Sequence, residues 1–217
     1  MIFYREEKFK ETPIGKIPED WEFARLENIT TDIYYGITAK AVAQRTNLRI
    51  LRTTDIKEYH VDWTGLPFCK ITEKRSKLDK YFVRRGDLIV ARAGTTGVSV
   101  LVEKDLNDVI FGSYLIKIRL KDGFFPKFIY YFFQSRYYWN HIISSQAGST
   151  LKNISLPVLR SLRIPLPPLL EQKAIAHILS TVDERLEIEM ERKEKLERIK
   201  KALMDLLLTG KIRVKVS

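Results

Sequence analysis

The sequence has very few residues of the kinds that bind metals or form disulfides. Among its 217 residues are one cysteine, Cys69, and three histidines, His60, His141 and His177. A single cysteine forms no disulfide framework and no cysteine-based metal site. The histidines show no spacing typical of a shared ligand set. We therefore expect no bound metal, and a lone cysteine fits a reducing cytoplasm.

Long apolar runs are also missing. No stretch of about eighteen apolar residues occurs, which predicts that no helix spans a membrane. The first residues, MIFYREEKFKET, are charged and hold no apolar segment, so we expect no signal peptide. Hydrophobic residues make up 45% of the chain and charged residues 30%, a composition typical of folded soluble proteins. A cytoplasmic location and no membrane partner are expected.

Motifs that carry chemistry are missing as well. No G-x-x-x-x-G-K-[ST] loop occurs, which argues against ATP binding. DNA methylation would need a Gly-rich strand–helix turn and an Asn-Pro-Pro-aromatic or Asp-Pro-Pro-aromatic clamp, but the adjacent prolines Pro167 and Pro168 follow a leucine. Glu191-Arg192-Lys193 matches part of a metal-nuclease motif, but it lies in a charged helical stripe where such side chains are solvated. We expect no catalytic residue and no cofactor.

Positive charge is abundant and unevenly distributed. The net charge is +11, from 38 Lys and Arg and 27 Asp and Glu. Residues 171–208 carry eight basic and nine acidic side chains, and the tail adds three basic ones, so residues 1–170 hold a net charge of +9. A basic globular part favours a polyanionic partner such as nucleic acid, although general solubility also explains a basic chain.

Short runs typical of β-strands fill the first 120 residues. After an entry loop at 14–23 they are rich in Val, Ile, Leu and aromatics and are separated by Gly, Asp, Asn and Thr. The run 114–120 alternates, which places Lys117 and Arg119 on one face of a half-buried strand. The predicted strands lie in 48–56, 86–92, 98–102, 108–112 and 114–120.

The segment 124–143 changes to a helical period, with Pro126 in a first turn. Four of its residues share one helical face: Phe128, Tyr131, Phe132 and Ser135. Such aromatics either form a stacking platform for single-stranded nucleic acid or pack against a sheet, and the second interpretation is favoured. After a loop at 144–155, Ser155 and Pro157 indicate a short helix. The prolines of 163–172 then favour an extended segment up to Leu169.

From residue 169 to 208 the composition is that of one long helix, which Gly210 ends. At about 1.5 Å per residue, residues 171–208 span roughly 57 Å. The helix carries two apolar rows at heptad spacing, interrupted by Glu189 in one row and by Lys193 and Lys200 in the other. Because so few positions are apolar, the helix needs a partner helix. The proposed dimerisation residues are Ile175, Val182, Leu196 and Leu203 in one row and Leu179, Leu186 and Leu207 in the other.

These elements predict a mixed α/β (α+β) fold. We expect a globular domain at 1–168 on a curled, mixed sheet. A long dimerising helix at 169–208 follows it and pairs as an antiparallel coiled coil. A basic tail occupies 209–217.

Ordered motifs along almost the whole chain resemble type I restriction–modification specificity subunits. They are IGKIPEDWEFARLENI, RTTDI, GDLIVARAGTTG, GSTLKNIS, RIPLPPLLEQKAIAHILSTVDE and KALMDLLLTGKIRV. Family members typically carry two target-recognition domains and two long helices. This chain resembles one such repeat, whether a natural half-subunit, a truncation or an engineered fragment. The resemblance implies that residues 1–168 form a DNA target-recognition domain and that the helix at 169–208 is a spacer.

The resemblance implies a function and partners. Such subunits read a bipartite target in double-stranded DNA and recruit DNA methyltransferase (modification) subunits, which methylate adenine with S-adenosylmethionine. Restriction subunits, which use ATP, join some of these complexes. The specificity subunit itself has no active site. As one repeat, this chain is expected to form a homodimer or to pair with a second half-subunit. Two alternatives stay open, an interaction scaffold that binds no DNA and a subunit with a hidden methyltransferase site.

Candidate DNA-binding residues lie in loops that combine small residues, cations and side-chain amides. Arg suits guanine and Gln or Asn suits adenine in the major groove, while Lys and Thr more often hold phosphate. Thr53, Thr54 and Asp55 could instead close a turn, and Ser149 or Thr150 could cap a helix. The candidates are Gly36, Thr38, Lys40, Arg45, Arg52, Thr53, Thr54, Arg92, Gly94, Thr95, Thr96, Gln146, Ser149, Thr150, Lys152 and Asn153.

Overall fold

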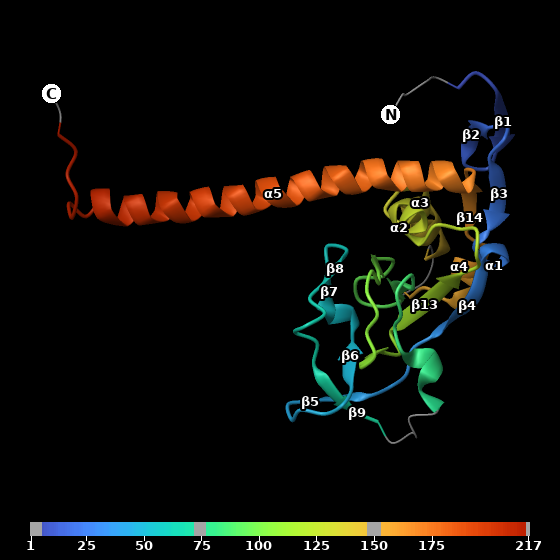
Figure 1. Ribbon diagram of the computed structural model, residues 1–217, viewed down its shortest axis with the longest axis horizontal. Coiled ribbons are helices and arrows are strands. Elements are labelled where there is room, and N and C mark those ends of the chain that lie inside the picture. The colour runs from blue at the N-terminus through green and yellow to red at the C-terminus, as the bar shows by residue number, and fades with distance from the viewer. Residues whose placement is uncertain (1–5, 72–76, 147–152, 216–217) are drawn as a thin grey trace. The chain divides into compact units, whose positions relative to one another are not determined.

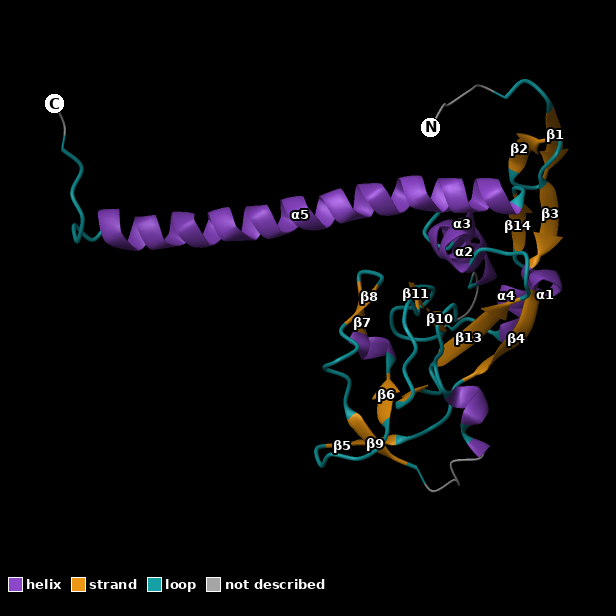
Figure 2. Cartoon of the chain, in the orientation of Figure 1, coloured by secondary structure: helices purple, strands orange, loops and turns teal. Residues whose placement is uncertain are grey.

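The computed structural model describes residues 6–71, 77–146 and 153–215 (Figure 1). It divides into two compact units, Met1–Ala174 and Ile175–Ser217, called unit 1 and unit 2. In unit 1 short strands are joined by loops and turns (Figure 2). The strands are β1 (Phe9–Thr12), β2 (Gly15–Pro18), β3 (Glu22–Arg25), β4 (Thr30–Tyr35), β5 (Lys40–Val42), β6 (Arg49–Leu51), β7 (Ile56–Lys57), β8 (His60–Val61), β9 (Phe68–Lys70), β10 (Leu88–Ala91), β11 (Ser99–Leu101), β12 (Val109–Phe111), β13 (Leu115–Leu120) and β14 (Arg163–Leu166). The helices are α1 (Leu26–Ile29), α2 (Pro126–Phe132), α3 (Arg136–Ser145), α4 (Leu156–Ser161) and α5 (Leu169–Leu207).

Two four-stranded sheets form the centre of unit 1. The first has the order β11-β10-β13-β4 and is antiparallel throughout. Every residue of its strand β10 is buried, as expected for an inner strand covered on both faces. The second has the order β12-β6-β9-β5, with β12 parallel to β6 and the other pairs antiparallel.

The second sheet curls back on itself. Ile37, just before its edge strand β5, makes a parallel bridge to Gly112, just after the opposite edge strand β12. Leu51, Ile89, Val109, Phe111 and Leu115 join both sheets in one buried core cluster. The predicted mixed α/β fold with a curled, mixed sheet is therefore confirmed, and each predicted strand run contains a strand.

The aromatic segment 124–143 forms two helices, not the single helix that its period predicts. The first helix ends at Phe132, and Ser135 begins the second because its side chain accepts a hydrogen bond from the Tyr138 amide and caps α3. Phe133 and Tyr138 are fully buried and stack with ring centroids 4.8 Å apart. The core interpretation of these aromatics is thus correct. The predicted face is shifted, however, because Ile129 and Phe133 are buried with Phe128 while Tyr131 and Phe132 are only half-buried.

The segment from α4 to the start of α5 has the order of elements that the sequence predicts: a short helix, an extended segment and a long helix. Ser155 occupies the N-cap position of α4, although its side chain makes no capping hydrogen bond. The extended strand β14 pairs with β3, and α5 begins at Leu169 after the proline pair. Gln172 fixes this junction, since its side chain accepts from the Phe125 amide at 2.9 Å and donates to the Pro167 carbonyl at 2.8 Å.

Unit 2 consists mainly of α5. Its apolar side chains are largely exposed, including Leu186, Leu196 and Leu203. Gly210 follows with a φ of +71°, the left-handed conformation that commonly ends helices. None of the described helices combines the length and the apolar character that crossing a membrane requires.

Candidate nucleic-acid interface

The candidate interface is organised around the turn between β10 and β11. The Gly97 amide donates to the Ala91 carbonyl at 2.8 Å and the Val98 amide to the Thr95 carbonyl at 3.0 Å, so the turn is a tight, ordered hairpin. Tyr138 anchors its base, with its buried hydroxyl donating to the Gly97 carbonyl at 2.7 Å. Gly97 is required because its φ is +94° and a side chain there would meet the Trp139 ring at 2.9 Å. Gly94 and Thr95 project from this turn into solvent.

Arg92, in the same turn, has both its backbone and its side chain held in place. Its amide donates to the Tyr114 carbonyl at 2.9 Å, and its carbonyl accepts from the Ile154 amide at 2.9 Å. Its guanidinium lies 4.3 Å from the centroid of the Tyr35 ring. The Tyr35 hydroxyl in turn accepts from the Leu156 amide at 3.1 Å. Four separate segments therefore meet at Arg92.

Two glycines complete this meeting point. A Cβ on Gly36 would lie 2.2 Å from the Gly112 carbonyl oxygen, so only glycine permits the crossing of the two backbones. A Cβ on Gly94 would lie 3.7 Å from Thr53 Oγ1, which puts the β10–β11 turn beside the turn after β6. We call this group the Arg92 cluster. It comprises Tyr35, Gly36, Thr53, Arg92, Gly94, Tyr114 and Asn153, the exposed neighbour of Ile154.

The candidates Thr53 and Thr54 lie in a 3₁₀ turn, Thr53–Asp55, and Arg52 is its N-cap residue. Arg52 is a partly engaged cation, because its Nε and Nη2 donate to the two Asp55 carboxylate oxygens at 2.9 and 2.7 Å. This hydrogen bonding raises the pKa of Arg52. The fork that would read guanine is thus occupied within the chain, whereas the Thr54 side chain is exposed.

Other candidates lie elsewhere. Thr38 is exposed before β5, Lys40 is the first residue of that edge strand, and Arg45 is exposed after it. Among the described residues, no hydrogen bond or ion pair links them to Arg92. Gln146 is the C-cap residue of α3 and Thr96 is half-buried in the hairpin turn. Ser149, Thr150 and Lys152 lie outside the described residues.

Two aromatic members of the Arg92 cluster, Tyr35 and Tyr114, were not predicted from the sequence. Tyr35 ends β4 and Tyr114 directly precedes β13, so both resemble core residues in the sequence. The Tyr114 side chain is nevertheless 64% exposed. The Tyr35 ring is half-buried beneath Arg92. Only their position beside turns rich in glycine could have distinguished them.

An ionic group links Lys117 and Arg119 of β13 to Asp87, the residue before β10. Lys117 and Asp87 are buried 3.8 Å apart, and Arg119 Nη2 lies 2.6 Å from the same carboxylate. Lys117 Nζ also donates to the Lys80 and Phe82 carbonyls at 2.6 and 2.9 Å. Burial raises the pKa of Asp87 and lowers that of Lys117. Lys117 and Asp87 belong to the core, and the half-buried strand predicted around Lys117 is in fact buried there.

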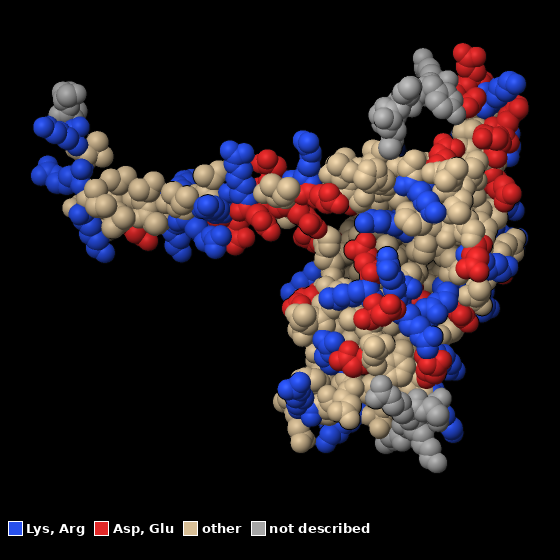
Figure 3. All heavy atoms as spheres, viewed as in Figure 1, with Lys and Arg blue, Asp and Glu red and all other residues tan. Residues whose placement is uncertain are grey.

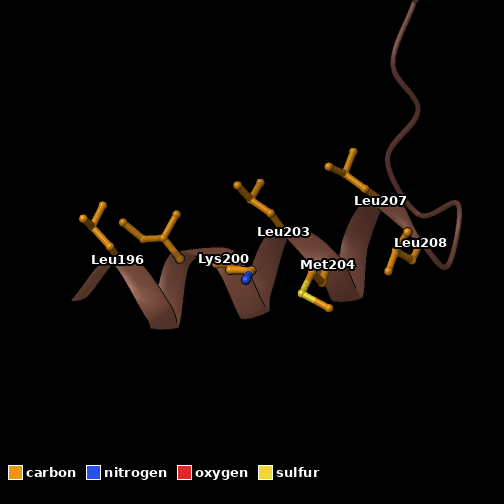
Figure 4. Close-up of a pocket in the computed structure, with 7 residues that line it drawn as sticks. Leu196, Lys200, Leu203, Met204, Leu207 and Leu208 are labelled. Atoms are coloured by element: carbon orange, nitrogen blue, oxygen red, sulfur yellow. The ribbon is translucent and has the colours of Figure 1, made fainter. Parts of the chain in front are cut away.

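The predicted dimerisation residues lie on α5. Leu196, Leu203 and Leu207 project from the same side of the helix (Figure 4). Acidic side chains gather in the middle of the helix and basic ones toward its C-terminal end (Figure 3). Residues 183–191 carry a net charge of −4 and residues 192–201 a net charge of +4.

Residues 18–198 match the family model for the type I restriction modification DNA specificity domain. The chain belongs to this family. The resemblance found in its sequence motifs is thereby confirmed. The MjaVIII specificity subunit of Methanocaldococcus jannaschii is 31% identical over 98% of this chain and 51% of that protein. The EcoKI specificity subunit of Escherichia coli is 28% identical over 94% and 45%.

This chain spans about half the length of the curated relatives it matches. Solved structures share its fold. The HsdS subunit from Thermoanaerobacter tengcongensis superimposes with a TM-score of 0.61 at 19% identity, covering 91% of this chain and 47% of that one. A chain from a structure of type I R-M complex assembly and conformational transition gives 0.65 at 20% identity, covering 89% and 47%.

Proposed function

We propose that unit 1 reads one half of a bipartite sequence in double-stranded DNA. The observation that carries this proposal is the Arg92 cluster, in which the candidates Gly36, Thr53, Arg92 and Gly94 come together. The exposed candidate Asn153 directly precedes Ile154, whose amide donates to the Arg92 carbonyl. Family membership and the net charge of +9 on residues 1–170 support it. A guanidinium and a side-chain amide at one loop face are suited to base edges in the major groove.

Selection of bound sequences from random duplex DNA tests this function, with the modification subunit present. Binding should select one short motif and should weaken with salt by about 0.9 log units of affinity per phosphate contact for each log unit of salt. Replacing Lys40 by Ala should weaken all duplexes alike, whereas replacing Arg92 or Gln146 should relax preference at particular bases. Salt-insensitive or absent DNA binding would favour the alternative, an interaction scaffold.

The proposed partners follow from the same function. The chain is non-catalytic in this proposal and requires no cofactor of its own. Modification subunits would bring S-adenosylmethionine and methylate adenine, and restriction subunits would bring ATP hydrolysis. Binding of S-adenosylmethionine by the isolated chain would instead favour a hidden methyltransferase site.

We also propose that α5 pairs with the α5 of a second copy in an antiparallel coiled coil. Aligning the two heptad rows places Ile175 opposite Leu207, Leu179 opposite Leu203 and Leu186 opposite Leu196 of the other helix. Glu189 then faces Lys193, and the acidic segment 183–191 faces the basic segment 192–201. Only the layer of Val182 and Lys200 is mismatched. A helix that complements itself in this way favours a second copy over an unrelated partner.

Exchanging charges in the middle of the proposed coiled coil tests the pairing of the two α5 helices. Glu189 and Lys193 make only long ion pairs within their own helix, each 3.9 Å, to Arg192 and Glu197. Glu189→Lys or Lys193→Glu should weaken the dimer roughly tenfold, since two attractive pairs become two repulsive ones at ~0.4 kcal/mol each. The double exchange should restore dimerisation. A monomeric wild-type chain at micromolar concentration would refute the proposal.

A further inference from the structure

The Arg92 side chain is presented on an aromatic support. Its guanidinium lies 4.3 Å from the Tyr35 ring centroid, within the range of a stacked cation–π contact. Tyr35 is itself fixed, because it ends β4 opposite Ile116 and its hydroxyl accepts from the Leu156 amide. The neighbouring Gly36 allows no side chain, so the backbone beside the ring cannot shift freely.

Two predicted reading side chains also have donors that find no acceptor. Within the described parts of the chain, Arg92 Nε and Gln146 Nε2 are buried polar atoms without a hydrogen-bond partner. Such donors are costly in a folded protein unless an acceptor is supplied. In contrast, Arg52 uses its fork on Asp55. Of these two arginines, Arg92 is the one whose fork is not taken by a carboxylate.

We propose that Tyr35 is a positioning residue that presets Arg92 for base recognition. The ring holds the guanidinium plane and leaves its edge for the acceptor atoms of a base, as guanine offers through O6 and N7. Because the side chain is ordered before binding, less rotamer entropy is lost on contact. This inference rests on the proposed DNA recognition, and it assigns to Tyr35 a role in specificity that involves no contact with DNA.

The test compares Tyr35→Phe, Tyr35→Leu, Arg92→Ala and Tyr35→Leu/Arg92→Ala on the selected duplex and a scrambled one. Tyr35→Phe keeps the ring and should keep the base preference. Tyr35→Leu should lose about 2- to 30-fold of affinity for the selected duplex, the range of a cation–π contact. It should relax the same base positions as Arg92→Ala and leave scrambled-duplex affinity within about twofold. The double variant should lose little beyond Arg92→Ala, since both act through one contact.

Arg92→Lys supplies a second test if Tyr35→Leu does not fold. It keeps the charge but lacks the flat fork, so base preference should fall while the salt dependence stays. Base preference that survives in Tyr35→Leu or in Arg92→Lys overturns the inference. If wild type prefers a sequence but Arg92→Ala does not change that preference, the inference fails while DNA recognition stands. A wild-type chain with no sequence preference would refute both.

Discussion

Lys117 and Asp87 form a buried ion pair in the core of unit 1. Lys117→Met leaves the Asp87 carboxylate paired with Arg119 alone, so the loss is smaller than for a fully uncompensated buried charge. The variant should lower the free energy of unfolding by about 1–3 kcal/mol, the cost of an unsatisfied buried polar group, measured by urea denaturation at pH 7. The variant also leaves the Lys80 and Phe82 carbonyls without the donor that they share.

The pH dependence of that loss has a definite sign. Burial raises the pKa of Asp87, so its contribution to stability is full below its ordinary value of 3.8 and is lost as pH rises through the raised pKa. The positive charge of Lys117 opposes this rise in the pKa of Asp87. The deficit of Lys117→Met should therefore shrink as pH falls toward 4, where the carboxyl becomes protonated. A deficit that stays constant or grows on acidification would contradict this account.

The two glycines of the Arg92 cluster should respond differently to alanine. Gly36→Ala places a Cβ 2.2 Å from a backbone oxygen and should destabilise unit 1 by more than about 2 kcal/mol. Gly94→Ala places a Cβ in ordinary van der Waals contact with Thr53 Oγ1, 3.7 Å away, at a φ of +75°, and should cost only about 1 kcal/mol of backbone strain. Thermal melting of both variants checks the difference. Equal losses would mean that the backbone crossing at Gly36 relaxes.

From the sequence, Arg92 and Gly36 were correctly predicted to lie in loops. That these two loops come together in one cluster was not predicted. Pairing Tyr35 with Ile116 and Gly36 with Leu115 depends on long-range sheet contacts that no local pattern reveals. Tyr35 and Tyr114 were missed because an aromatic residue at a strand end is more often core. Which candidates read DNA stays a prediction.

At the scale of elements, local sequence patterns predicted best the elements whose composition is strongly biased, toward apolar residues in one case and toward charged residues in the other. The fully buried β10 and the long charged α5 were predicted within a few residues. The aromatic segment 124–143 was not, because helical period alone does not reveal the break between the end of α2 at Phe132 and the Ser135 cap of α3. Sheet curling was expected, but the bridge between Ile37 and Gly112 that closes it needs tertiary contacts.

Dimerisation through α5 can be tested with a matched pair of exposed residues. Leu196 and Ile188 are 57% and 62% exposed, but only Leu196 lies on the proposed seam. Leu196→Lys puts a charge opposite Leu186 of the other copy and should give a monomer at micromolar concentration. Ile188→Lys should remain dimeric. Light scattering distinguishes the two results, and equal behaviour of both variants would place the interface on another face of the helix.

At the scale of the whole molecule, a symmetric dimer has a consequence for its target. Two identical recognition units related by a two-fold axis should read the same bases on opposite strands, so the site should be a palindrome of two half-sites around an unread gap. The paired helices would set the length of that gap. The division of the chain into a recognition domain, a spacer helix and a basic tail likewise stays a prediction.

Inserting one heptad between Glu189 and Lys195 tests the spacer and the recognition together. It lengthens each helix by about 10 Å while the seam keeps its register. At roughly 3.4 Å per base pair, the gap should widen by about three base pairs. The measurement is methylation-site mapping of wild-type and lengthened chains with the same modification subunit. The account predicts unchanged palindromic half-sites and a wider gap; an unchanged gap, or altered half-site bases, would contradict it.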